Sequence, residues 1–260
     1  MIKEAQLEAK LRFFEACEKQ RNSARRGGIG TLREKTLHAA LKLYIEPDKE
    51  KHEIPVGAFV ADVLNENGIF EIQTGGFTPL REKLRRVLSE TQYQITVVCP
   101  IPARKRLIWI DQETGELTDP RVSPKHGRFT DAYPELVKLG EVIASEKVSV
   151  LLMLIDMDEY RMLNGWSRDR KRGSTRYERI PTALQSELLL RTAEDHARLL
   201  PDSLPESFTA ADLKRELKLL PRPAYNMAKV LETVGATECV GKRGRARLYK
   251  RSRSSDTDAD

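Results

Sequence analysis

Two acidic side chains stand inside short apolar segments in the first third of the chain. Asp62 lies within 59–64, and Glu71 lies within 69–72. Carboxylates are poor strand formers, so their presence in strand-like segments needs a reason. If a hairpin joins the two segments, Asp62 and Glu71 come side by side. Two carboxylates that leave room for water make a site suited to Mg²⁺.

Gln73 follows Glu71 by two residues and therefore points to the same face of an extended strand. Beside a phosphate, Mg²⁺ or Mn²⁺ polarises the phosphoryl oxygen and activates a water molecule, and a glutamine amide can orient that water. The alternative interpretation is a solvated carboxylate pair at a strand edge, with Asp62 as an ordinary polar residue near a turn.

The helices expected around this pair follow from apolar spacing. The first twenty or so residues predict a helix whose apolar face carries Leu7, Leu11 and Phe14. Thr31 and Glu34 have the spacing of a capping box and predict the start of a second helix, which Pro47 ends. Its apolar stripe consists of Leu37, Leu41 and Tyr44.

Short apolar runs and turn residues then predict three strands in an antiparallel meander, at 52–56, 59–64 and 69–73. A helix opening at Thr78 and a buried strand at 94–99 follow. Beyond them we expect a strand at 106–110, a helix at 131–145, a strand at 148–155, and a helix after Pro181 that carries Leu184, Leu188 and Leu189.

The order α-β-β-β-α-β and the residues placed on it resemble the PD-(D/E)XK nuclease superfamily, in the branch similar to archaeal Holliday-junction resolvases and restriction endonucleases. The resemblance covers roughly 30–100 and is carried by Gly30, Glu34, Asp62 and the Glu71-Ile72-Gln73 run. It implies that Asp62, Glu71 and the backbone carbonyl of Ile72 hold Mg²⁺ or Mn²⁺, with Glu34 as a further direct or water-mediated ligand. Gln73 departs from the pattern because it replaces the usual Lys.

A basic segment with aromatic residues follows the strand at 148–155. Arginine binds phosphate bidentately and can stack on bases, so the segment predicts contact with nucleic acid. A solvated basic loop with Trp166 in the core is the alternative. The residues concerned are Trp166, Arg168, Arg170, Lys171, Arg172, Arg176 and Arg179.

The last part of the chain reads as helix, turn, helix and basic hairpin, the outline of a winged helix-turn-helix. We expect a first helix from about Phe208, a break at 221–223, a second helix at 224–234, and strands at 237–240 and 246–249. Contacts to DNA are predicted for Arg222, Tyr225, Asn226 and Lys229 on the second helix and for Lys242, Arg243 and Arg245 on the wing. Winged helices also bind proteins, but the basic wing favours DNA.

Composition sets the class of protein. The 260 residues carry 45 Lys and Arg against 39 Asp and Glu, a net charge of +6, and no apolar run long enough for a membrane helix. Cys17, Cys99 and Cys239 are widely spaced, which predicts neither disulfides nor zinc and fits a reducing compartment. The charged first residues argue against a secretory signal, so a cytoplasmic location is expected.

Together these features predict an α/β protein with a restriction-endonuclease-like core and an extended mixed sheet, followed by a small winged-helix domain. The expected parts are an N-terminal helix at 1–28, the nuclease-like domain at 29–200, the winged helix at 206–252 and a disordered tail at 253–260. The predicted function is Mg²⁺- or Mn²⁺-dependent hydrolysis of nucleic-acid phosphodiesters. One alternative is a non-catalytic DNA-binding regulator or adaptor with an inactive core. Another is an enzyme that acts on a different phosphate-containing substrate. The sequence leaves open whether the protein forms a homodimer.

Overall fold

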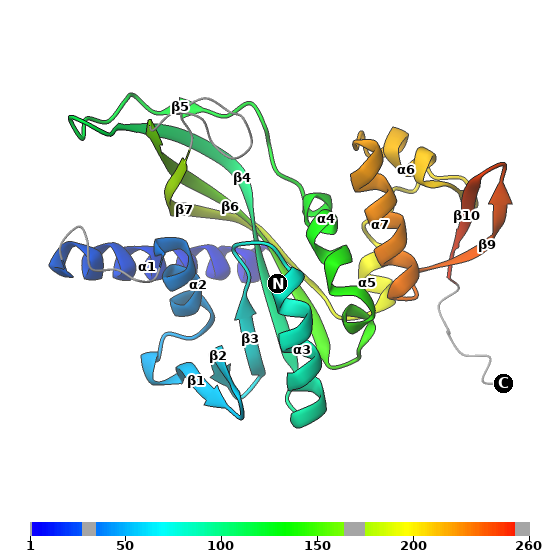
Figure 1. Cartoon of the computed structure of the whole chain (residues 1–260), viewed down its shortest axis with the longest axis horizontal. Coiled ribbons are helices and arrows are strands. Elements are labelled where there is room, and N and C mark those ends of the chain that lie inside the picture. Colours follow the sequence, from blue (N-terminus) through cyan, green and yellow to red (C-terminus); the bar gives the residue numbers. More distant parts are fainter. Residues whose placement is uncertain (1, 28–34, 164–174, 253–260) are drawn as a thin grey trace. The chain divides into compact units, whose positions relative to one another are not determined.

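The computed structural model describes residues 2–27, 35–163 and 175–252 (Figure 1). Several predicted features lie outside the described residues: Gly30, Thr31 and Glu34, five of the seven residues predicted in the basic segment, and the tail at 253–260. No helix in the described ranges combines the length and the apolar character that crossing a membrane requires.

The chain forms two compact units, each made of several segments. The first unit consists of Met1–Thr74, Val98–Phe129 and Leu152–Leu188, and the second consists of Gly75–Val97, Thr130–Leu151 and Leu189–Asp260. The long strands β4 (Ile95–Asp111), β6 (Val148–Leu163) and β7 (Thr175–Leu190) contribute residues to both units.

Helices α1 (Ile2–Gly27) and α2 (Thr36–Ile45) pack against each other in the first unit. Phe13 is fully buried and meets the ring of Tyr44 edge to face, with ring centroids 5.5 Å apart. The predicted apolar face of α1 is wrong, because Leu7, Leu11 and Phe14 are each more than half exposed. The packed face is the neighbouring one, which carries Ala9, Phe13, Ala16 and Cys17.

The second helix is confirmed, with Leu37, Leu41 and Tyr44 buried. Its described start differs from the prediction, because α2 begins at Thr36 with Lys35 at the N-cap position and no side-chain cap. Helix α2 lies against strands β2 (Phe59–Asn65) and β3 (Gly68–Ile72).

The antiparallel meander is confirmed. A short 3₁₀ turn η1 (Lys49–Lys51) leads into β1 (His52–Val56), β2 (Phe59–Asn65) and β3 (Gly68–Ile72). Gly57 and Gly68 have φ of 59° and 106°, which the turns between these strands require and which glycine adopts without strain. Helix α3 (Thr78–Glu90) follows, with Pro79 in its first turn as expected.

Three long strands complete the large sheet, and here the sequence expectations fail most. The predicted strands at 94–99 and 106–110 are one strand, β4 (Ile95–Asp111), and the strand predicted at 148–155 continues to Leu163 in β6 (Val148–Leu163). The helix predicted after Pro181 is wrong, because Leu184, Leu188 and Leu189 belong to strand β7 (Thr175–Leu190).

The strand order explains how Pro181 fits within β7. The large sheet has the order β1-β2-β3-β4-β6-β7, with β5 (Arg121–Val122) paired to β4. Strand β7 is therefore an edge strand, where a residue without a backbone N–H is tolerated.

The segment predicted as one helix at 131–145 is helical, but it is broken into three pieces. These are η2 (Phe129–Ala132), α4 (Tyr133–Leu136) and η3 (Val137–Ala144). Gly140 interrupts the last piece with φ 62° and ψ −141°, a conformation outside the helical region.

The second unit continues with α5 (Ala193–Ala197), β8 (Ser207–Phe208), α6 (Ala210–Glu216), α7 (Pro221–Thr233), β9 (Thr237–Arg243) and β10 (Ala246–Arg251). The expected Thr cap of α6 is confirmed, since Thr209 and Asp212 form a capping box. The break expected at 221–223 is wrong, because Pro221 occupies the first turn of α7, where its missing N–H costs nothing. Strands β8, β10 and β9 form a separate antiparallel sheet in that order.

Candidate functional site

The β2–β3 ladder brings the predicted carboxylates to opposing positions. Its register pairs Val63 with Phe70 and Leu64 with Ile69, so the next position along the ladder sets Asp62 opposite Glu71. Directly opposed residues of an antiparallel pair point to the same face of the sheet. The backbone N–H of Ile72 donates to Asp62 Oδ2 at 2.7 Å, which holds the two strands in register at this point.

The two carboxylates differ in their access to water. Glu71 is only 4% exposed, whereas the side chain of Asp62 is 23% exposed. A carboxylate is rarely buried inside a strand unless a partner or a cation compensates its charge. The pair therefore has one deep and one more accessible oxygen donor.

Helix α2 adds one basic side chain to the site, His38, and places Lys42 of the same helix against Glu53 of β1. His38 Nε2 lies 3.3 Å from Asp62 Oδ2, and Lys42 Nζ lies 3.0 Å from Glu53 Oε1. His38 was not among the residues predicted for the site. Its position four residues after Glu34 and four before Lys42 was the available signal, because i and i+4 share a helix face.

Gln73 lies just beyond the end of β3, and its backbone N–H donates to the carbonyl of Val98 in β4 at 2.9 Å. The remaining predicted metal ligand, the carbonyl of Ile72, belongs to the last residue of β3. In the part of the chain that the structure describes, no group of three or more His, Cys, Asp or Glu side chains could hold a metal ion. Two carboxylates and a backbone carbonyl still fit Mg²⁺, which keeps several waters and uses few protein ligands.

A cluster of cations surrounds a second buried carboxylate in the same unit. Glu159 of β6 has a side chain that is 1% exposed and is bonded to Arg161, with Lys105 Nζ at 3.3 Å and Arg176 Nε at 3.8 Å. We call Glu159, Lys105, Arg161 and Arg176 the Glu159 cluster. Burial raises the pKa of Glu159, but the Arg161 hydrogen bond and the neighbouring positive charges outweigh burial and keep the pKa below its usual value.

Arg179 connects this cluster with the end of β3. Its Nη2 donates to the carbonyl oxygen of Thr74, the residue after Gln73, at 2.7 Å. Burial, and then repulsion from Arg176, lower the pKa of the Arg179 guanidinium below its ordinary value. Of the predicted basic segment, Arg176 and Arg179 are the residues that the structure describes, and both lie in β7.

Further along the same strands, basic side chains are neutralised by acidic neighbours that the sequence interpretation did not consider. Arg104 and Arg106 of β4 donate to Asp156 and Asp158 of β6, each with an Nη2 to Oδ2 distance of 2.6 Å. These pairs border a hollow of about 230 Å³ that also includes Val122 and Thr182. Alternating charges across neighbouring strands stabilise a sheet by cross-strand attraction.

In the second unit, the predicted DNA-contacting residues of α7 share one side of the helix. Arg222, Tyr225 and Lys229 are exposed and Asn226 is half-buried, whereas Met227, Ala228 and Leu231 are buried. On the wing, Lys242, Arg243 and Arg245 are all exposed. Arg243 is partly engaged, because its guanidinium lies 3.4 Å from Asp212 Oδ2 and donates to the carbonyl of Ser207.

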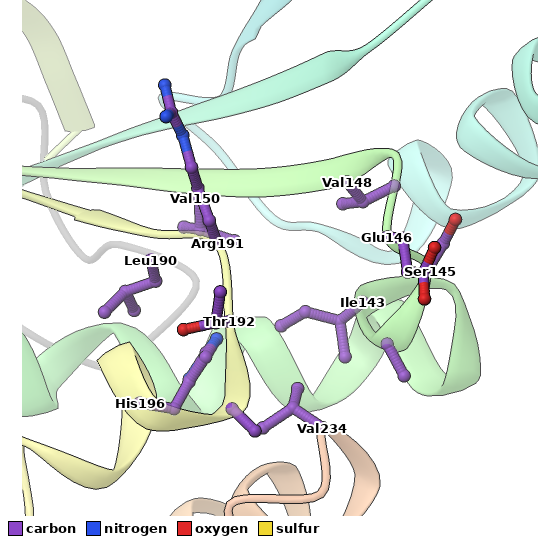
Figure 2. A pocket seen from close by; sticks show the side chains of 12 residues that line it. Ile143, Ser145, Glu146, Val148, Val150, Leu190, Arg191, Thr192, His196 and Val234 are labelled. Carbon is purple, nitrogen blue, oxygen red and sulfur yellow. The ribbon is translucent and has the colours of Figure 1, made fainter. Parts of the chain in front are cut away.

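The second unit also contains a pocket of about 460 Å³ that no sequence motif indicated (Figure 2). Its lining is mixed, with Ile143, Val148 and Val150 beside Arg191 and His196. His196 is 3% exposed, its Nδ1 lies 3.4 Å from the hydroxyl of Tyr133, and burial lowers its pKa to about 4. The histidine is therefore neutral near pH 7.

Comparison with known proteins identifies relatives whose names state no activity. The profile of a family described as "Domain of unknown function (DUF8091)" matches residues 35–191, more than half of the chain. A Treponema pallidum (strain Nichols) protein titled "Uncharacterized protein" is 30% identical over 229 residues, which cover 88% of this chain and 89% of that protein. No solved structure matches the chain. The family match includes the carboxylate pair, the Glu159 cluster and Arg179.

Proposed function

The chain belongs to the DUF8091 family, and we propose that it is a metal-dependent nuclease that hydrolyses phosphodiester bonds of nucleic acid, with DNA as the favoured substrate. The observation that carries this proposal is the opposition of Asp62 and Glu71 on one face of the β2–β3 ladder. Two carboxylates at adjacent strand positions form a hard-oxygen site beside which a phosphate can bind.

The arrangement of the elements supports the same conclusion. Helix α2, strands β1 to β3, helix α3 and strand β4 follow the α-β-β-β-α-β order of the PD-(D/E)XK superfamily. The carboxylates stand on the second and third strands of that order, as the resemblance implies. A restriction-endonuclease-like core is therefore the finer fold that we propose for this α/β chain.

In this proposal, Asp62, Glu71 and the carbonyl of Ile72 hold Mg²⁺ or Mn²⁺. The bound ion supplies Lewis-acid polarisation of the phosphoryl oxygen and a more acidic water molecule. Ile72 N–H and His38 fix the orientation of the Asp62 carboxylate through contacts of 2.7 Å and 3.3 Å to Oδ2. Gln73 orients the attacking water with its amide, which can accept and donate hydrogen bonds at once.

We further propose that the C-terminal part delivers the core to duplex DNA as a winged helix. The order α5, β8, α6, α7, β9, β10 and the β8-β10-β9 sheet agree with that architecture. The exposed side of α7 suits the major groove, and the wing suits phosphates. In the described part of the chain, Arg222, Lys229, Lys242 and Arg245 have no ion-pair partner and are available to a polyanion.

The test is cleavage of labelled duplex, junction and single-stranded DNA, and of RNA, by purified protein with Mg²⁺ or Mn²⁺. We expect Asp62→Ala and Glu71→Gln to lower the cleavage rate by at least about 100-fold, the scale for losing a group that stabilises transition-state charge. The matched control is Glu66→Gln, an exposed carboxylate in the β2–β3 turn that lies 3.5 Å from Lys51. Cleavage of none of these substrates, or full activity of Asp62→Ala, would refute the proposal.

The second candidate is a non-catalytic DNA-binding regulator or adaptor with an inactive core. Two observations favour it: the contacts of Asp62 with His38 and with Ile72 N–H, and the neutral Gln73 where the PD-(D/E)XK superfamily has Lys. Calorimetric titration with Mn²⁺ separates the candidates. A regulator should bind duplex DNA through α7, and Lys229→Gln should weaken that DNA binding. It should bind no Mn²⁺ at Asp62, so the titration curves of the wild-type protein and Asp62→Ala should be the same.

A further inference from the structure

A phosphodiester under attack gains negative charge, and a nearby cation stabilises that charge. Gln73 cannot supply this cation because its amide is neutral at all pH values of interest. If the chain hydrolyses phosphodiesters, the positive charge must come from another element in the same unit. A basic side chain that contacts the end of β3 would be suitably placed to supply it.

Arg179 of β7 is the cation that contacts the segment just after β3. Its Nη2 donates to Thr74 O at 2.7 Å, one residue beyond Gln73. Within the described residues, the guanidinium makes this one hydrogen bond and forms no ion pair with a carboxylate. The other N–H groups of its planar fork remain available for a ligand with oxygen acceptors.

Arg179 is half-buried, and its guanidinium hydrogen-bonds a backbone carbonyl rather than a carboxylate. The charged groups that act on it are Arg176, which repels it, and Glu159 and Glu178, which attract it from beyond ion-pair distance. Burial and the repulsion from Arg176 outweigh that attraction and lower the pKa of Arg179, so an anion bound at this guanidinium would be stabilising. Glu159 offsets part of the repulsion and holds Arg161 and Lys105 in place.

We propose that Arg179 binds the phosphate next to the carboxylate pair and replaces the cation that Gln73 lacks. Arg176 forms the outer part of the same phosphate clamp, and Glu159 is a positioning residue for it. This inference rests on the proposed function, because it names the group that receives the phosphodiester of a nucleic acid. A planar guanidinium suits a phosphate because it can donate two parallel hydrogen bonds.

The test compares Arg179→Gln, Arg179→Lys and the control Arg85→Gln, an exposed arginine of α3 that pairs with Glu82 at 2.9 Å. Binding of a fluorescent 20-base-pair duplex is measured by anisotropy in EDTA across a series of salt concentrations. We expect Arg179→Gln to reduce the slope of log K against log [salt] by about 0.9, the value for one phosphate contact. With Mg²⁺ or Mn²⁺, its cleavage rate should fall about 100- to 1,000-fold.

Arg179→Lys distinguishes the role of charge from a role in folding. It should keep the salt slope, because the charge remains, and lose part of the cleavage rate, because the bidentate fork is gone. Arg85→Gln should change neither quantity. An unchanged slope and an unchanged rate in Arg179→Gln would overturn the inference and leave the proposed nuclease intact. If the wild-type protein cleaves nothing, the nuclease fails, and the salt slope alone decides whether Arg179 contacts phosphate.

Discussion

Glu159 has a carboxylate that is almost completely buried and has three basic side chains around it. Lys105 and Arg161 are only about one-fifth exposed and Arg176 is about half exposed, so water screens Arg176 better than the other two cations. Removing one member of a buried ion pair leaves the others uncompensated, which is the costly case. The strands β4, β6 and β7 therefore depend on this residue for their stability.

We expect Glu159→Ala to lower the free energy of unfolding by about 3 kcal/mol, the lower end of the range for breaking a buried ion pair, because the cations reach solvent. Urea denaturation at pH 7 measures the change. The control is Glu194→Ala, which removes an exposed pair with Arg198 and should leave stability nearly unchanged. Equal effects of both substitutions would show that the cluster is no more stabilising than a surface pair.

At the scale of elements, α1 shows that periodicity identifies a helix without identifying its buried face. The side chains of Leu7, Leu11 and Phe14 repeat at helical spacing, yet the helix packs through the face of Phe13. The reason is the partner: Tyr44 of α2 contacts both Phe13 and Arg12, and a residue on another element leaves no mark on the periodicity of α1.

This arrangement predicts opposite outcomes for neighbouring substitutions in α1. Phe13→Ala removes a fully buried ring and should lower the free energy of unfolding by about 3 to 5 kcal/mol. Leu11→Gln changes a side chain that is 56% exposed and should alter stability by less than about 0.5 kcal/mol. Denaturation of the two variants under the same conditions checks both values. A large loss in Leu11→Gln would mean that this face is covered in solution.

Strand β7 illustrates a second limit at the element scale. The segment contains Leu184, Leu188 and Leu189, whose spacing of four and one fits a helix as well as a strand. Pairing with β6 decides for the strand, and the contacts of β7 reach far in sequence, such as Glu187 accepting from the hydroxyl of Tyr44 at 2.7 Å. Non-local pairing of this kind overrides local propensity.

At the scale of the whole molecule, the free energy of unfolding depends on pH through the buried side chain of His196. His196 has a pKa of about 4 in the folded protein because burial disfavours its charged form. An unfolded histidine has a pKa near 6.5. The unfolded chain therefore binds a proton at a higher pH than the folded chain, and stability falls as the pH drops from about 6.5 towards 4.

We expect this histidine to contribute a loss of about 2 kcal/mol between pH 7 and pH 5, since each pH unit below 6.5 costs about 1.4 kcal/mol. Replacing it with phenylalanine, His196→Phe, removes the titrating group while keeping a ring near Tyr133. Chemical denaturation of both proteins at the two pH values isolates the difference. Identical pH dependence of the two proteins would show that His196 is accessible to protons in the folded state.

The net charge of +6 can be interpreted only once the ion pairs of the folded chain are known. Several arginines of the long strands are paired with acidic residues, as Arg104 is with Asp156 and Arg106 with Asp158. Other basic residues, such as Lys229 and Lys242, have no ion-pair partner in the described part of the chain. The charge available to a polyanion therefore depends on which cations the fold has already neutralised.

Local features could be predicted from the residues alone: the helical character of α2 with Leu37, Leu41 and Tyr44 buried, the β1 to β3 meander, the capped α6, and the candidate pair Asp62 and Glu71. Period, turn glycines and caps act between residues close in the chain, so they can be read without a structure. Tertiary packing fixed which face of α1 is buried and made β7 a strand. It also placed His38 beside Asp62 and Arg179 against Thr74, just after the end of β3. Those features depend on contacts between distant segments, and such contacts leave no periodic trace in the sequence.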